Sequence, residues 1–391
     1  MVEGTHRLCV APMMDWTDRH CRVFHRILAP HARLYTEMVH AQAVIHGDRD
    51  RLLGFDAVEH PVALQLGGSD PAHLAQATRI AVEWGYDEVN LNVGCPSDRV
   101  QAGRFGACLM REPALVADCV AAMRAAAGDV PVTVKCRLGV DEMEDYDVFV
   151  AFVDTVAATG CDTFVVHARK AWLQGLSPKE NREIPPLRYD WVDRLKAERP
   201  ALRLVLNGGL SEVDVAVAAA RRLDGAMIGR AAYHEPYRLH RMDRALFAPD
   251  AAPRERADLL RDLRPYAEAM LARGTAIKHL TRHILGLFHA QPGGRAFRQI
   301  LSEGAPKAGA DWSLVERALA ATSRALDAAS RSGERKAGKK GPRMTRLTRQ
   351  KQVGWARNFA APRRSGGDEP ILLPSCSVVY FVSVVARNTS A

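Results

Sequence analysis

Residues 91–97 read Leu-Asn-Val-Gly-Cys-Pro-Ser, and the rest of the chain can be interpreted outward from them. Val89 and Leu91 lead into a Gly-Cys-Pro turn, which is typical of a buried strand that ends at the mouth of a parallel sheet. Pro96 cannot continue a strand ladder and disfavours helix at the preceding residue, so Cys95 is expected at a bend. Because thiols are mostly protonated at neutral pH, Cys95 can serve as a proton donor. The alternative is a small buried filler, the commonest role of a free cysteine.

Eight short apolar runs recur over roughly the first 240 residues, and most are followed by a helical pattern. The runs are 8–11, 34–36, 62–66, 88–92, 132–135, 163–167, 203–207 and 225–228. Helical patterns cover 71–84, 113–127, 146–159 and 211–221, the first with Asp70 as N-cap and Pro71 in its first turn. This rhythm predicts an α/β fold, a (β/α)8 TIM barrel. A doubly wound sheet is the alternative, but neither G-x-G-x-x-G after the first run nor G-x-x-x-x-G-K-[ST] is found.

Residues able to bind or react stand at the carboxyl ends of seven runs, where barrel enzymes collect their chemistry. They are Pro12-Met13-Met14, Gln65, Asn92 with Cys95, Lys135, His167, Asn207-Gly208-Gly209 and Gly229-Arg230. The last two groups follow runs seven and eight, the usual phosphate site of a barrel. Glycines there let the backbone approach an anion, and Arg230 can neutralise it. Two ordinary turns are the alternative.

The pattern changes after Tyr233 and is helical from about residue 253 to 330, with candidate helices at 261–272, 277–288 and 312–326. We therefore expect a catalytic barrel at 1–245, a small all-helical domain at 246–330 and a basic, disordered tail at 331–391. The helical domain carries basic side chains that could lie on a solvated face or follow a phosphate backbone. They are Lys278, His279, Arg282, His283, Arg295 and Arg298.

Charge and cysteine content limit the class of protein. The chain has 391 residues and a formal charge of +9, but residues 331–364 hold twelve Lys or Arg against one acid, so the remainder is close to neutral. The eight cysteines are scattered, without C-x-x-C pairs or zinc spacing, which favours a reducing cytoplasm and no metal site. No segment resembles a signal peptide or a membrane span.

Five motifs stand in order along the chain: APMMDWTD at 11–18, YTEM at 35–38, ALQLGG at 63–68, NLNVGCPS at 90–97 and SPKENREIPP at 177–186. Together they resemble the tRNA-dihydrouridine synthases, most closely the A subfamily, over residues 8–303. The resemblance implies an FMN-bearing barrel joined to a helical tRNA-binding domain. It also implies reduction of uridine to 5,6-dihydrouridine at D-loop positions 20 and 20a, with NADPH as reductant or NADH in its place. The sequence gives no sign of an obligate protein partner.

The resemblance also implies roles for individual residues. Cys95 matches the proton donor to C5 of uracil. The implied FMN contacts are Pro12, Met13, Met14, Gln65, Lys135, His167, Asn207, Gly208, Gly209, Gly229 and Arg230. The implied tRNA contacts are Asn92, Lys179, Arg182, Arg295 and Arg298. Lys135 would be a fixed cation near the developing charge, and His167 would act likewise or hold the substrate.

Two other functions remain open from the sequence. One is a flavin barrel that reduces a small pyrimidine, as dihydroorotate dehydrogenases do, although such a substrate needs neither the helical domain nor the pairs Lys179/Arg182 and Arg295/Arg298. The other is a tRNA-binding protein without activity, which the intact Cys95 and flavin set argue against. NADPH has no nucleotide fold of its own here, so it is expected to use the same mouth as tRNA in turn.

Overall fold

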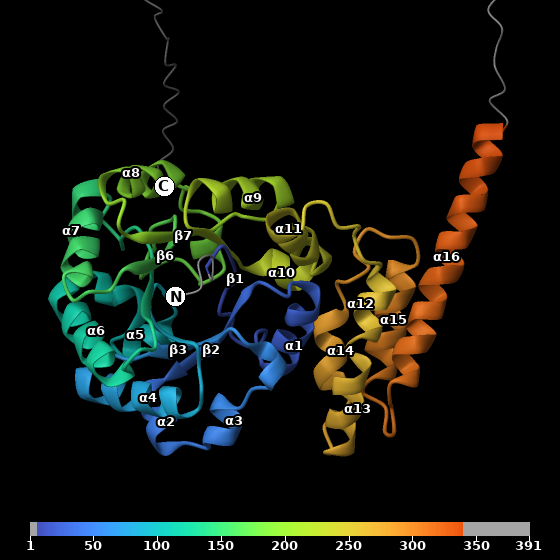
Figure 1. Ribbon diagram of the computed structural model, residues 1–391, viewed down its shortest axis with the longest axis horizontal. Helices are drawn as coiled ribbons and strands as arrows, with labels where there is room; N and C mark the ends of the chain where they lie inside the picture. The colour runs from blue at the N-terminus through green and yellow to red at the C-terminus, as the bar shows by residue number, and fades with distance from the viewer. Residues whose placement is uncertain (1–5, 339–391) are drawn as a thin grey trace, which may run out of the picture. The chain divides into compact units, whose positions relative to one another are not determined.

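The computed structural model describes residues 6–338, and its strands form a closed barrel of eight parallel strands (Figure 1). Their order around the barrel is their order in the sequence, and β8 pairs with β1. The strands are β1 Leu8–Val10, β2 Arg33–His40, β3 Val62–Gly67, β4 Glu88–Val93, β5 Val132–Cys136, β6 Thr163–His167, β7 Arg203–Asn207 and β8 Gly225–Ile228. The predicted (β/α)8 barrel is confirmed.

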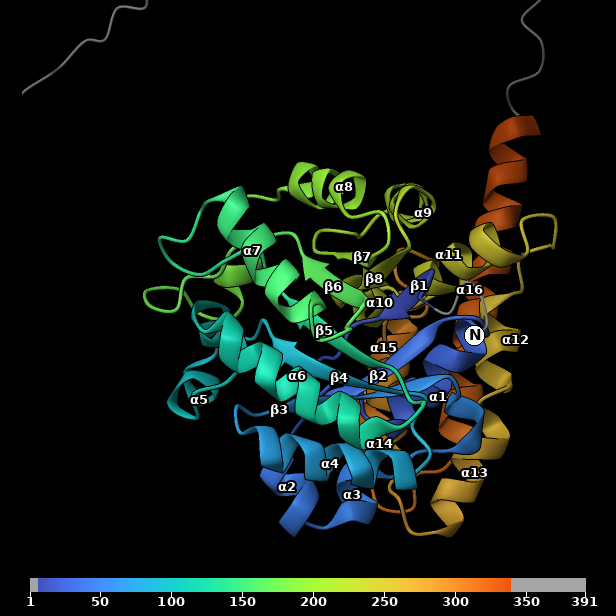
Figure 2. The same cartoon turned by 60° about the vertical axis from the view of Figure 1, so that its left-hand side comes forward.

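Helices surround the strands, as Figure 2 shows for α4, α6, α7 and α8. The helices up to residue 247 are α1 Arg19–Leu28, α2 Ala41–His46, α3 Arg49–Leu53, α4 Pro71–Glu83, α5 Asp98–Ala102, α6 Pro113–Ala127, α7 Tyr146–Ala157, α8 Tyr189–Glu198, α9 Val213–Arg222, α10 Arg230–His234 and α11 Tyr237–Phe247, with 3-10 turns η1 Ala57–Glu59, η2 Gly106–Arg111 and η3 Glu180–Arg182. The predicted start of α4 is confirmed: Asp70 Oδ1 accepts a hydrogen bond from His73 N at 2.8 Å, and Pro71 begins the helix.

The barrel interior holds an apolar cluster together with buried polar residues. The cluster consists of Cys9, Ala11, Tyr35, Ala63, Val165, Val205 and Met227, whereas the larger apolar core packs helices against strands. The sequence predicts a buried apolar run at 88–92. The burial is confirmed, but the run is not wholly apolar. Glu88, Asn90 and Asn92 alternate with apolar residues along β4 and are all buried. Buried polar groups need partners, and these are described below.

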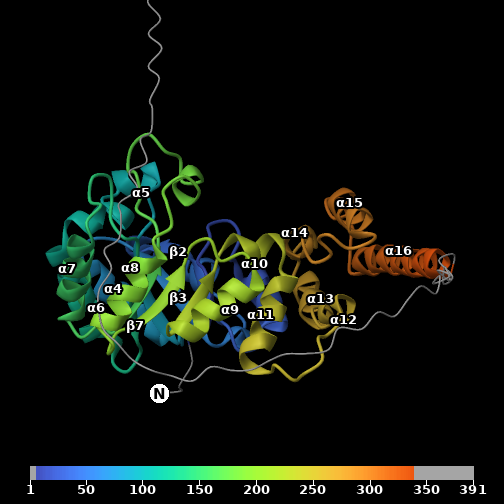
Figure 3. The same cartoon turned by 90° about the horizontal axis from the view of Figure 1, so that it is seen from above.

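Within the described residues, five helices follow the barrel (Figure 3), and they share a second apolar core. They are α12 Arg256–Arg261, α13 Arg264–Ala272, α14 Lys278–Ile284, α15 Gly294–Gly304 and α16 Ser313–Gly338. Val23, Phe24 and Leu28 of α1 belong to the same core, so these helices are fastened to the barrel through α1. The division of the chain at residue 245 stays a prediction.

One expectation for the C-terminal part needs correction, and one question that the sequence left open is partly answered. Helix α16 runs to Gly338, so residues 331–338, predicted as disordered tail, are helical. Arg282 and His283, which could have followed a phosphate backbone, instead bind Asp18, the N-cap of α1, at 2.7 Å and 3.0 Å. They therefore fasten α14 to the barrel. The rest of the predicted tail, 339–391, lies outside the described residues.

A membrane-crossing helix would have to be both long and apolar, and none between residues 6 and 338 meets that requirement.

Candidate active site

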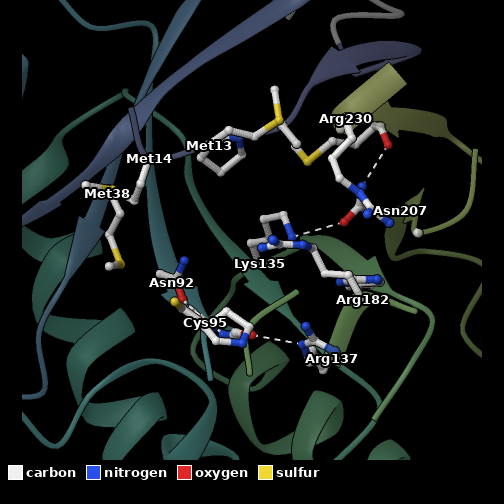
Figure 4. Close-up of a pocket in the computed structure, with 18 of the residues that line it drawn as sticks. Met13, Met14, Met38, Asn92, Cys95, Lys135, Arg137, Arg182, Asn207 and Arg230 are labelled. Carbon is white, nitrogen blue, oxygen red and sulfur yellow. Dashed lines mark hydrogen bonds between the residues drawn. The ribbon is translucent and has the colours of Figure 1, made fainter. Parts of the chain in front are cut away.

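A cavity of about 500 Å3 opens at the carboxyl ends of the strands (Figure 4). All the residues predicted to hold FMN line it: Pro12, Met13, Met14, Gln65, Lys135, His167, Asn207, Gly208, Gly209, Gly229 and Arg230. Cys95, Asn92 and Arg182 line it as well. Figure 4 shows Cys95 and Asn92 on one side, Arg230 and Asn207 on the other, and Lys135 between them. The barrel therefore brings a thiol, cations and a glycine pair to one cavity.

Hydrogen bonds from three other residues hold the Cys95 turn in place. Asn92 Oδ1 accepts hydrogen bonds from the backbone N–H groups of Gly94 and Cys95, at 3.1 Å and 3.0 Å. Arg137 Nε donates to the Gly94 carbonyl at 2.9 Å, and Ala107 N donates to the Cys95 carbonyl, also at 2.9 Å. The Cys95 side chain is half-buried, with its Sγ 3.6 Å from Ser97 Oγ. The thiol thus keeps a defined place while remaining open to the cavity.

Lys135 is half-buried and places its ammonium in the middle of the cavity. Its Nζ donates a hydrogen bond to Asn207 Oδ1 at 3.1 Å, and Asn207 Nδ2 donates to the Met227 carbonyl at 2.8 Å. Burial, and then the charge of Arg137, lower the pKa of Lys135 to about 8. Lys135 is therefore a cation at neutral pH that loses its charge under mildly alkaline conditions.

His167 differs from Lys135 in its charge. It is 9% exposed. Burial, and then the charges of Arg137 and Lys135, place its pKa well below the ordinary value. The imidazole is therefore neutral at neutral pH. Of the two roles that the sequence left open, this environment disfavours the fixed cation and favours a hydrogen-bonding group.

The glycines after β7 and β8 form a cradle beside Arg230. Gly208 and Gly209 have φ angles of 103° and 68°, which side chains rarely adopt, and a Cβ at Gly208 would lie 2.5 Å from His167 Cδ2. At Gly229 a Cβ would meet only Ala11 Cβ, at 4.0 Å, so the absence of a side chain leaves room in the cavity. Arg230 is paired with Glu183 of the loop after β6. These features suit an anion that could take the place of the Glu183 carboxylate at Arg230.

The predicted tRNA contacts are placed less uniformly than the cofactor set. Asn92 Nδ2 donates to Gln65 Oε1 at 2.8 Å, and its Oδ1 holds the Cys95 turn, so Asn92 has a positioning role that the sequence did not reveal. Arg182 is exposed at the cavity, whereas Lys179, three residues earlier, is exposed outside its lining. Arg295 and Arg298 are exposed on α15, and neither lines the cavity.

Arg137, Trp16 and Met38 are among the lining residues to which the sequence assigned no role. Arg137 is 3% exposed and also donates to the Lys170 and Asn181 carbonyls, at 3.0 Å and 2.9 Å, which ties the loop after β6 to the Cys95 turn. Its place two residues after Lys135, on the same face of the chain, was an available signal. Trp16 stacks on Tyr233 with ring centroids 4.5 Å apart, and Met38 lies near the carboxyl end of β2. Both stand inside motifs that carry the family resemblance, Trp16 at 11–18 and Met38 at 35–38.

The fold and the cavity define a (β/α)8-barrel enzyme with a thiol and an anion cradle in one site. The chain belongs to the dihydrouridine synthase family, because the family model described as "Dihydrouridine synthase (Dus)" matches residues 9–325.

Individual relatives agree with this assignment. The chain is 71% identical over 312 residues to the tRNA-dihydrouridine(20/20a) synthase of Xanthomonas campestris pv. campestris, covering 80% of this chain and 92% of the relative. The proteins of the same name from Xylella fastidiosa strain 9a5c and Vibrio cholerae are 67% and 54% identical, over 81% and 80% of this chain and 93% and 96% of theirs. Neither alternative function gains support from them.

Among solved structures, the old yellow enzyme homologue from Zymomonas mobilis has a TM-score of 0.45 and 13% identity, over 63% of this chain and 90% of that chain. A likeness at this level carries no argument about fold or chemistry.

Proposed function

We propose that the protein reduces uridine to 5,6-dihydrouridine at positions 20 and 20a of tRNA, with FMN as bound cofactor and NADPH as reductant. One observation carries the proposal: Cys95 and the glycine cradle with Arg230 line the same cavity, in a chain 71% identical to a protein named for this activity. Both tRNA and NADPH are cytoplasmic, so we place the activity in the cytoplasm.

The residues of the cavity fit FMN in both charge and space. Arg230 and the backbone at Gly208, Gly209 and Gly229 would hold its phosphate, because glycines admit close approach and the guanidinium supplies charge. Gln65 and Lys135 would hold the ring, with the Lys135 ammonium stabilising negative charge on it. When bound and reduced by NADPH, FMN supplies the hydride that C6 of uracil receives.

Cys95 would complete the reduction by protonating C5. As the hydride arrives at C6, the C5–C6 double bond opens and negative charge builds on C5 and the C4 carbonyl. The thiol gives its proton to C5, a C–H bond forms, and the resulting thiolate is reprotonated from water. A carboxylate at this position would be ionised at neutral pH and unable to donate. The neutral imidazole of His167 would hold the base through a hydrogen bond.

The uridine cannot reach this cavity while stacked in folded tRNA, so it must be turned out of the stack. Arg182 at the mouth, Lys179 on the same loop, and Arg295 and Arg298 on α15 would bind phosphates around it. Their exposure leaves all four side chains accessible to an RNA backbone.

The test is mass spectrometry of tRNA from a strain that lacks its own synthases for positions 20 and 20a. Expression of this protein should restore a mass increase of about 2 Da, which corresponds to two added hydrogens, at those two uridines. Purified protein with FMN and NADPH should give the same product. Unmodified uridine at both positions, in cells and in the purified reaction, would contradict the proposal.

A further inference from the structure

The inner face of β4 carries a continuous line of polar side chains from one end of the barrel to the other. Glu88 begins the strand, Asn90 follows two residues later, and Asn92 stands below the Cys95 turn. All three are buried, and residues two apart on a strand share a face. The strands on either side add Gln65 of β3 and Thr133 of β5.

These side chains are joined by hydrogen bonds in an unbroken sequence. Thr133 Oγ1 donates to Glu88 Oε1 at 2.6 Å, and Asn90 Nδ2 donates to Thr133 Oγ1 at 2.8 Å. Gln65 Nε2 donates to Asn90 Oδ1 and Asn92 Nδ2 donates to Gln65 Oε1, both at 2.8 Å. Asn92 Oδ1 then accepts from the N–H groups of Gly94 and Cys95. We call this series, Glu88–Thr133–Asn90–Gln65–Asn92, the β4 polar chain.

The Glu88 carboxylate, at the lower end of the β4 polar chain, has four polar side chains around it. Besides Thr133, Tyr35 OH lies 2.7 Å from Glu88 Oε1, while His6 Nε2 and Arg33 Nη1 lie 2.7 Å and 3.3 Å from Oε2. Burial would raise the pKa of Glu88, but the charges of His6 and Arg33 and the hydrogen bonds from His6 and Thr133 outweigh it and hold the pKa at about 2. Glu88 is therefore an ionised group that can only accept.

The two ends of the β4 polar chain fix the donor and the acceptor of every hydrogen bond between them. Glu88 can only accept, so the Thr133 hydroxyl must donate to it and accept from Asn90. At the other end the backbone N–H groups of Gly94 and Cys95 can only donate, so Asn92 must present its oxygen to them. A turned amide anywhere in between would set donor against donor or acceptor against acceptor.

We propose that Glu88 is a positioning residue that orients Gln65 and the Cys95 turn through the β4 polar chain, and that Thr133 is the link through which it acts. Neither Glu88 nor Thr133 lines the cavity. Their effect is to give Gln65 and Asn92 a single amide orientation, and so to hold the thiol in one place. The proposal rests on the proposed function for its purpose, but its physical content is a property of the protein without cofactor.

The matched variants are Thr133→Val and Thr133→Ser. Valine keeps the shape of threonine and removes the hydroxyl, which leaves Asn90 Nδ2 without its acceptor and frees the amides above it to turn. Serine keeps the hydroxyl and loses only a methyl group. Glu88→Gln is the second probe, since it keeps the shape of the carboxylate and ends its acceptor-only character.

The readout is the rate at which iodoacetamide alkylates Cys95 in the FMN-free protein, measured by peptide mass spectrometry. Thr133→Val should raise that rate about fivefold or more, because a buried amide without a partner destabilises the bonded arrangement. Thr133→Ser should stay within about twofold of the unmodified protein, since its hydroxyl preserves the link. Glu88→Gln should act like Thr133→Val. Cys108, which is also half-buried but does not line the cavity, is the internal control for general loosening.

Each outcome decides the proposal. A faster Cys95 reaction with an unchanged Cys108 reaction in Thr133→Val and in Glu88→Gln, together with a Cys95 rate near that of the unmodified protein in Thr133→Ser, would support it. Equal acceleration at both cysteines would reduce Thr133 to a structural role and overturn it, as would an unchanged Cys95 rate. If the protein without substitutions formed no dihydrouridine in tRNA, the proposed function would be wrong. The difference in alkylation rate between the variants would still test the β4 polar chain.

Discussion

Lys135 is the residue whose charge state should be most visible in kinetics. Its pKa of about 8 means that the ammonium is charged below that pH and neutral above it. NADPH oxidation by the FMN-loaded Cys95→Ala variant should therefore fall as pH rises through about 8, and Lys135→Met in that background should lose this alkaline limb. Using Cys95→Ala removes the thiol from the profile. If the rate of NADPH oxidation still fell at alkaline pH in the Lys135→Met variant, the fall would be due to another group.

The lowered pKa of Lys135 also makes the stability of the folded protein depend on pH. The folded pKa lies below the ~10.4 of an unfolded lysine, so the folded protein holds fewer protons between those values. The contribution of Lys135 to stability should accordingly rise with pH across that window.

Arg230 and Glu183 form a pair that predicts opposite effects on FMN binding. Arg230→Ala should weaken FMN about tenfold or more, because a charge-assisted hydrogen bond to phosphate is lost. Glu183→Gln removes the carboxylate that occupies Arg230, so binding should be as tight as in the unmodified protein or tighter. Fluorescence titration of FMN measures both. An Arg230→Ala protein that retains FMN as the unmodified protein does would remove the phosphate site.

On helix α15, one substitution should affect the stability of the fold and another should affect tRNA binding. Phe297 is fully buried, with its ring centroid 4.8 Å from that of Phe288, so Phe297→Ala should cost about 3–5 kcal/mol of stability. Arg298 is exposed on the same helix, and Arg298→Ala should leave the melting temperature nearly unchanged while weakening tRNA binding. Thermal melts and tRNA binding at two salt concentrations distinguish them. Unchanged tRNA affinity in Arg298→Ala would exclude α15 from the RNA surface.

Strands were predictable from the sequence because they are buried on both faces and end in recognisable turns. The runs at 163–167, 203–207 and 225–228 are β6, β7 and β8 without change, and β1, β3, β4 and β5 each differ by one residue, whereas β2 extends to His40. Helix α15 was missed because Gly293 and Gly294 resemble a loop, whereas Gly293 adopts a φ of 79° and begins the helix. The basic composition after Arg331 hid the last turns of α16.

The site was predictable where sequence position decides it and less so where side chains meet across strands. Cys95, Lys135 and Arg230 could be placed because they stand at or just after the carboxyl ends of strands, and these ends converge in a barrel. The partners of Asn92 and the reach of Arg137 to three carbonyls depend on contacts between distant segments. No local pattern encodes those contacts.

At the scale of the whole molecule, the segment after α16 should be dispensable for choosing the uridine. The family match ends at residue 325, and all the cavity residues precede it. Deletion of residues 339–391 should therefore leave the modified positions unchanged, as judged by mass spectrometry of the tRNA product. A shift in which uridines are reduced would show that this segment takes part.

The central claim is that Cys95 donates the proton that completes reduction of the base. Its most direct test is a single turnover of the FMN-loaded, NADPH-reduced Cys95→Ala variant with substrate tRNA, followed by flavin absorbance and by product mass. We predict that the variant oxidises NADPH normally and forms no dihydrouridine above background, whereas Cys108→Ala forms it as the unmodified protein does. Product at the unmodified rate in Cys95→Ala would contradict the account.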